Sequence, residues 1–98
     1  MEAALAVLSG RWTTLVLREL MHGPRSYGDL SGSLPRLSDK VLSDRLRTMV
    51  EQGLAERGET TGFPTRTTYS LTDRGLLLRP LLVELYRTGQ GLLDTRGP

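Results

Sequence analysis

Hydroxyl and cationic side chains share one face of the segment SDKVLSDRLRTMVEQGLAER, residues 38–57. At 100° per residue, the apolar side chains of this predicted helix fall within a single sector, at Leu42, Leu46, Met49 and Val50. The opposite side carries Lys40, Ser43, Asp44, Arg47 and Glu51, with Asp39 and Arg45 on its flanks. Lysine, arginine and serine can bind phosphate oxygens or base edges, so this face predicts contact with a nucleic acid. On the helix alone, a merely solvated face remains the alternative, with Asp44 paired to Lys40 or Arg47.

The sequence offers little for catalysis or metal binding. The 98 residues contain no cysteine and a single histidine, His22, which excludes thiol chemistry and zinc sites of the usual Cys/His type. No carboxylate pair, nucleophile with a base, or phosphate-binding glycine loop is visible, so we expect no enzyme, no cofactor and no metal. The net charge of +2 with a pI near 9.5 is compatible with a polyanionic partner without establishing one.

Length and hydropathy predict one domain over residues 1–98 that does not enter a membrane. No apolar run approaches the ~20 residues that a membrane span needs, and no charged-then-apolar leader is visible. We therefore expect a cytoplasmic protein.

Capping residues and helix-ending glycines and prolines predict where the helices that position the polar face begin and end. A helix over residues 12–21 ends at a Gly-Pro pair. Ser26 and Asp29 form a capping pattern at the start of a short helix, which Pro35 closes. Ser38 is a good N-cap for the next helix, and Gly53 ends it. The order is helix, short helix, tight turn, helix.

After this helix the apolar pattern changes to a period of two. Residues 54–60 and 66–71 flank the turn sequence TGFP, which predicts a β-hairpin. Cations and hydroxyls gather on the hairpin, and a cation and a hydroxyl also begin the short helix: Arg57, Thr65, Arg66, Thr67 and Thr68, then Arg25 and Ser26. The fold class expected is mainly α with a small β-hairpin, a winged helix-turn-helix. Its second helix would enter the major groove of double-stranded DNA, and its hairpin wing would touch the backbone or the minor groove.

The last predicted helix runs from Asp73 to about Leu93, capped by Thr72, with Pro80 kinking or restarting it. Its leucines are spread too widely around the helix for one small domain to cover. We therefore expect a partner helix from a second copy of the chain. The alternative is that one face packs within the chain and the other leucines are simply exposed.

Three stretches resemble a known family over residues 5–86. LSGRWTTLVLRELMHGPRSYGDL is similar to the opening of HxlR-type winged-helix transcriptional regulators, where a Gly-Lys-Trp-Thr stretch precedes an aliphatic helix and an Arg-Phe-x-Glu-Leu stretch. LPRLSDKVLSDRLRTMVEQGLAER resembles their recognition-helix region, and PTRTTYSLTDRG resembles their wing. The resemblance implies a homodimeric, sequence-specific DNA-binding repressor or activator whose first and last helices form the dimer contact.

Individual residue roles follow from this resemblance. It implies DNA contacts in the recognition helix and wing by Ser38, Lys40, Ser43, Arg45 and Arg66. On the terminal helices we expect dimer contacts at Leu5, Leu8, Leu78, Leu82, Leu85 and Tyr86. The chain departs from the motif at Arg11, where the family has lysine, and at Tyr27, the aromatic position. It also lacks the cysteine that many members carry ahead of the tryptophan motif, so a sensed signal would be a non-covalent ligand or the protein's own abundance.

Two interpretations of Trp12 stay open. It is either a core side chain or, with Tyr86, the wall of a pocket for an unidentified small-molecule effector at the dimer interface. The rival to DNA binding is a winged-helix module that binds protein, which the modest net charge favours.

Overall fold

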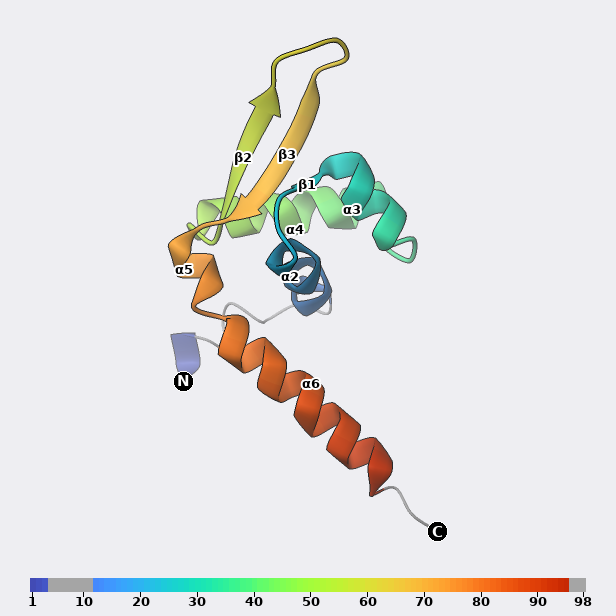
Figure 1. Ribbon diagram of the computed structural model, residues 1–98, viewed down its shortest axis with the longest axis vertical. Coiled ribbons are helices and arrows are strands. Elements are labelled where there is room, and N and C mark those ends of the chain that lie inside the picture. Colours follow the sequence, from blue (N-terminus) through green and yellow to red (C-terminus); the bar gives the residue numbers. More distant parts are fainter. Residues whose placement is uncertain (4–11, 96–98) are drawn as a thin grey trace.

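Helices and a small sheet form the body of the molecule, and the last helix extends away from it (Figure 1). The computed structural model describes residues 1–3 and 12–95. Its elements in chain order are α2 (Thr13–Met21), β1 (Arg25–Ser26), α3 (Tyr27–Ser33), α4 (Asp39–Glu51), β2 (Ala55–Thr60), β3 (Arg66–Leu71), α5 (Asp73–Leu76) and α6 (Arg79–Asp94). The predicted winged helix-turn-helix is confirmed: α3 and α4 are the helix pair, and the β2–β3 hairpin is the wing.

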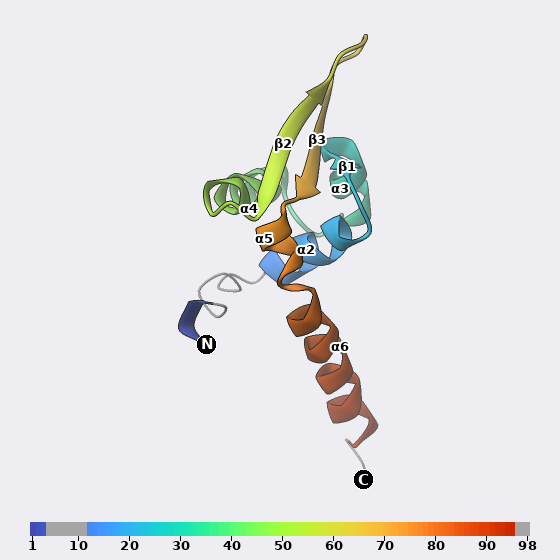
Figure 2. The same cartoon turned by 60° about the vertical axis from the view of Figure 1, so that its left-hand side comes forward.

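The wing and α6 project from opposite ends of the body, as Figures 1 and 2 both show. The principal-axis extents are 56 × 27 × 22 Å. The predicted first helix, with Leu5 and Leu8, lies outside the described residues except at its start, and Arg11 of the family motif also lies outside them.

Apolar side chains from α2, α3 and α4 meet in one core that the base of the wing completes. Its buried members are Val16, Leu17, Leu20, Leu30, Leu34, Leu37, Leu42, Leu46, Met49, Leu54, Ala55 and Tyr69. Of the four inward residues predicted for α4, three are buried and Val50 is only partly so. Burial of leucines along one stripe therefore fixes which face α4 turns outward.

Side-chain caps set the starts of α3 and α4, as predicted. Ser26 Oγ accepts from the Asp29 amide (3.1 Å), and Asp29 Oδ2 accepts from the Ser26 amide (3.3 Å), which completes a capping box. Ser38 Oγ accepts from the Val41 amide at 3.2 Å. At the end of α4, Gly53 has a φ of +73°, which allows the Schellman cap.

The sheet has three strands in the order β1-β3-β2, all antiparallel. The β2–β3 register runs from Ala55 opposite Leu71 to Thr60 opposite Arg66. The strand β1 was not predicted from the sequence; its residues Arg25 and Ser26 pair with Tyr69 and Thr68. A two-residue strand has no period of its own, so the pairing arises from the tertiary fold. It seats the start of α3 against the wing.

The last predicted helix is two helices, because Pro80 restarts it at the beginning of α6. Thr72 caps α5 by accepting from the Gly75 amide at 3.1 Å, as expected. Among the described residues, no helix combines the length and apolar character needed to cross a bilayer.

Candidate nucleic-acid interface

A groove of about 590 Å³ lies between the start of α3, the outer face of α4 and the wing. Its lining is Ser26, Tyr27, Gly28, Asp29, Ser43, Arg57, Thr65, Arg66, Thr67 and Tyr69. Five predicted site residues thus lie on one surface although they come from three separate parts of the chain: Ser26, Ser43, Thr65, Arg66 and Thr67. The predicted residues Arg25, Ser38, Lys40, Arg45 and Arg47 are not part of the lining.

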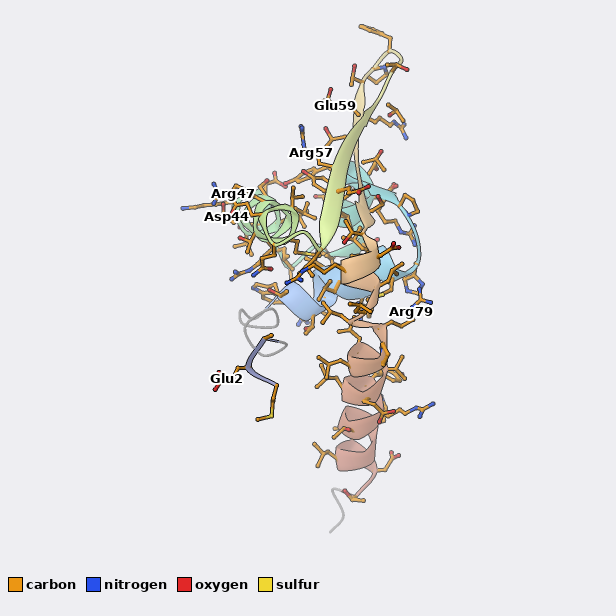
Figure 3. The ribbon with its side chains drawn as sticks, turned by 90° about the vertical axis from the view of Figure 1, so that its left-hand side faces the viewer. Glu2, Asp44, Arg47, Arg57, Glu59 and Arg79 are labelled. Atoms are coloured by element: carbon orange, nitrogen blue, oxygen red, sulfur yellow. The ribbon has the colours of Figure 1, made fainter. Side chains whose placement is uncertain are left out.

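The predicted contact residues of α4 differ in exposure and in the partners that they already have within the chain. Ser43 and Lys40 are exposed. Arg47 is exposed but lies 3.4 Å from Asp44 and 4.0 Å from Glu51, so the i+3 pairing expected for Asp44 is present (Figure 3). Arg45 is partly buried, and its Nε is buried without a hydrogen-bond partner among the described residues. Ser38 uses its oxygen as the helix cap.

The wing presents two arginines to the groove. Arg57 Nη2 lies 3.5 Å from Glu59 Oε1, and Figure 3 shows both on β2. Arg66 is exposed, and within residues 1–3 and 12–95 no carboxylate forms an ion pair with it. Thr65 donates to the Gly62 carbonyl oxygen (3.4 Å), which orders the tip. Arg66 is therefore the arginine of the wing whose guanidinium is available to bind an anion.

Asp29 is the carboxylate of the groove. Its hydrogen bonds from Ser26, first the side chain and then the backbone, lower the pKa of Asp29 below its usual value of 3.8, and nearby Arg25 and Arg66 add to this. The carboxylate is therefore charged at neutral pH, and it is committed to the helix cap.

In the sequence, Tyr27 was identified only as the aromatic position of the family motif. Its hydroxyl donates toward the Asp39 carbonyl oxygen (3.2 Å) and Asp39 Oδ1 (3.4 Å), and lies 3.1 Å from Ser43 Oγ. These contacts tie α3 to the first turns of α4. Local periodicity carries no signal of them, because the partners are 12 and 16 residues away.

The far end of α4 is held by residues that follow the wing. Thr72 Oγ1 donates to the Gly53 carbonyl oxygen at 2.6 Å, and Arg74 Nε donates to the Gln52 carbonyl oxygen at 3.1 Å. A Cβ on Gly75 would collide with the Leu54 carbonyl oxygen, so only glycine allows this close approach. Sequence analysis found the cap made by Thr72 but not its link to α4.

A second groove, of about 900 Å³, lies between α2 and α6. Its lining is mostly apolar and includes Leu15, Met21, Leu82, Val83, Leu85 and Tyr86. Trp12 is not in the lining; it is partly buried and packs against the core. The structure therefore does not bring Trp12 and Tyr86 together in this groove.

A helix-turn-helix pair beside a cationic wing defines a winged helix-turn-helix protein. Comparison with known proteins assigns the family: residues 7–96 match the family described as HxlR-like helix-turn-helix, and the chain belongs to it. The resemblance found in the sequence motifs is thus confirmed.

Two Bacillus subtilis relatives are transcriptional regulators by name. The HTH-type transcriptional regulator YvaP is 36% identical over 93 residues, which cover 95% of this chain and 86% of YvaP. The HTH-type transcriptional regulator YodB is 31% identical over 85 residues, 87% of this chain and 76% of YodB. The solved structure of reduced YodB has a TM-score of 0.78, covers 98% of this chain and 90% of the YodB chain, and is 28% identical. The chain is thus a winged-helix transcriptional regulator.

Proposed function

We propose that this chain binds double-stranded DNA sequence-specifically as a homodimer, with α4 in the major groove and the wing on the backbone or minor groove. The observation that carries the proposal is the groove in which Ser43 of α4 faces the wing residues Arg57 and Arg66. A base-reading group and phosphate-binding cations need this adjacency, because both must meet one DNA surface. Such a regulator acts where the chromosome lies, in the cytoplasm.

Cations around the groove would provide the affinity. Lys40 and Arg66 are exposed and free to reach phosphates, whereas Arg47 must first leave Asp44 and Glu51. Each phosphate contact releases counterions, so binding weakens as salt rises. The hydroxyls of Ser26, Ser38, Thr65 and Thr67, with Arg25 and Arg45, complete the proposed contact surface.

The homodimer is proposed from the surface of α6. None of the 16 residues of α6, all within the described part of the chain, is buried. Large apolar side chains are exposed along it: Val83, Leu85, Tyr86, Leu92 and Leu93. Most of the stability of a helix in a protein comes from the packing of its apolar face. A second α6 would cover these side chains, with Leu78 and Leu82 nearer the body, and we expect Leu5 and Leu8 to join this contact.

A ligand-responsive regulator is the second candidate, and the groove between α2 and α6 favours it. The groove includes Tyr86 and adjoins the proposed dimer surface, where a bound molecule would alter how two wings are spaced. The relative YodB has been solved in a quinone-bound form. These 98 residues contain no cysteine, so a ligand here would bind non-covalently.

Selection of bound sequences from a random duplex pool, at two salt concentrations, tests the proposal. We expect an enriched inverted repeat, with half-sites about 34 Å apart or a multiple of that distance, and affinity that falls steeply with salt. No enriched sequence, or binding insensitive to salt, would overturn it in favour of a protein-binding winged helix.

A further inference from the structure

We infer that Tyr27 determines which bases Ser43 can recognise. By accepting the Ser43 hydroxyl hydrogen, Tyr27 leaves Ser43 Oγ able only to accept, so Ser43 reads the amino group of adenine or cytosine. The inference rests on the proposed DNA binding and deepens it at a single residue.

Three oxygens surround the Tyr27 hydroxyl, and two of them have no hydrogen to give. The Asp39 carbonyl oxygen at 3.2 Å and the Asp39 carboxylate oxygen at 3.4 Å can only accept. Ser43 Oγ, at 3.1 Å, can donate or accept. Tyr27 has one hydrogen, so the arrangement of partners decides where that hydrogen points.

The Tyr27 hydrogen goes to Asp39, and the Ser43 hydrogen goes to Tyr27. With this assignment, each contact joins a donor to an acceptor, and the bond to a carboxylate is of the stronger, charge-assisted kind. The reverse assignment, with Tyr27 donating to Ser43, places the tyrosine oxygen against two acceptor oxygens without a hydrogen between them. An uncompensated contact of that kind is unfavourable.

The remaining lone pairs of Ser43 Oγ are directed at whatever lies in the groove. Ser43 is exposed and lines the groove, so these lone pairs are accessible. A phosphate oxygen also only accepts, which removes phosphate as a partner for Ser43 while Tyr27 holds its hydrogen. Guanine and the oxygen of thymine present acceptors in the major groove, whereas adenine N6 and cytosine N4 present donors. Ser43 therefore favours adenine or cytosine on the strand it faces.

Two nearby arginines can bind the DNA backbone in place of Ser43. Arg57 and Arg66 line the same groove and can bind the backbone. Ser43 is then not needed for phosphate affinity, and its contribution appears as base preference.

The test uses the full chain and three variants: Tyr27→Phe, Ser43→Ala and, as a control for loss of an exposed hydroxyl on α3 that does not line the groove, Ser33→Ala. Phenylalanine keeps the ring of Tyr27 in place, and the related family motif has phenylalanine there. Each protein is offered the random duplex pool, and affinities are then measured for duplexes substituted at every position of the enriched site. Thermal melting checks that each variant is folded.

We expect the wild type to prefer adenine or cytosine at one position of each half-site by about fivefold, the worth of one hydrogen bond. Ser43→Ala should lose that preference. Tyr27→Phe should widen it to guanine and thymine, because the serine hydrogen can now be donated. Ser33→Ala should leave the whole pattern unchanged. In all variants, the base preference at every other position of the site should stay the same.

A merely structural Tyr27 would weaken all sequences alike in Tyr27→Phe, and that result would overturn the inference. So would an unchanged preference in Ser43→Ala, which remains informative even if Tyr27→Phe were to unfold. A wild type that enriches no sequence would overturn the proposed function itself, a different outcome from an enriched site that ignores both substitutions.

Discussion

The face formed by α4 and the wing is held by the chain at many points, whereas α6 is held near its start. Ser38 caps one end of α4, Tyr27 bonds to its first turns, and Arg74 bonds to a carbonyl at its other end. On α6, Arg79 donates to the Met21 carbonyl oxygen at 3.3 Å, and Leu82 packs against the core. Beyond the groove that it forms with α2, the helix runs clear of the body (Figure 1).

This difference indicates that the surface proposed to read DNA is formed within one chain. A helix fixed at both ends presents its outward side chains in one orientation, which sequence recognition needs. The far part of α6 has apolar side chains without a covering surface. Its order and its function in the proposed dimer both depend on a second copy.

The largest expected effect is the difference in stability cost between a substitution in the core beneath α4 and one at the far end of α6. Leu46 is fully buried, and Leu92 is 67% exposed. Leu46→Ala should lower the free energy of unfolding by about 2–5 kcal/mol, because it leaves a cavity in the core. Leu92→Ala should change the free energy of unfolding of the monomer by less than about 0.5 kcal/mol. Urea unfolding at a concentration where the chain is monomeric measures both, and equal losses would contradict the comparison.

The next effect concerns association. Leu85 is 46% exposed on α6, and the proposed dimer buries it. Leu85→Glu should raise the dimer dissociation constant by roughly 10- to 100-fold. Each dimer covers two half-exposed copies of Leu85, which together are worth about as much as one fully buried leucine, roughly 1.5–3 kcal/mol. Analytical ultracentrifugation gives the constant. Gln90→Glu, an exposed position of the same helix, is the matched control and should have little effect. A dimer unaffected by Leu85→Glu would place the interface elsewhere.

A smaller effect distinguishes free from paired cations on the α4 and wing face. Arg66→Ala or Lys40→Ala should weaken binding to all sequences and reduce the slope of log affinity against log salt by about 1. Arg47→Ala should reduce that slope by less, because Asp44 and Glu51 already engage its guanidinium. Titrations at four or more salt concentrations provide the slopes. If all three variants changed the slope equally, the ion pairs of Arg47 would have no bearing on DNA contact.

What could be predicted from the sequence was local. Ser26 with Asp29, Ser38, and Pro80 act on residues within one turn, so their patterns were sufficient to place helix starts. The leucine stripe of α4 likewise predicted its buried face. These signals established the helix pair, the wing and the outward side of α4.

What escaped prediction depends on residues far apart in the chain. The Tyr27–Ser43 contact spans 16 residues, and the Arg74–Gln52 bond spans 22. The pairing of β1 with β3 joins Arg25 to Tyr69. No periodicity reports such contacts, because they exist only after the elements pack. The surface residues were predictable by type, but the hydrogen bonds that orient them were not.

The smallest expected effect contrasts a carboxylate of each region as pH falls. Hydrogen bonds from Ser26 lower the pKa of Asp29 in the folded chain below its usual value of 3.8. A lowered folded-state pKa stabilises the fold above the unfolded value, and that stabilisation is lost as pH falls through the folded one. The melting temperatures of the wild type and Asp29→Asn should therefore differ by a constant amount above about pH 5 and converge below the usual pKa. Asp94→Asn, at the end of α6, removes a carboxylate outside the groove and is the matched control for the loss of one negative charge. If the wild type and Asp29→Asn still differed in melting temperature at acid pH, the capping bond would stabilise α3 without depending on the charge of Asp29.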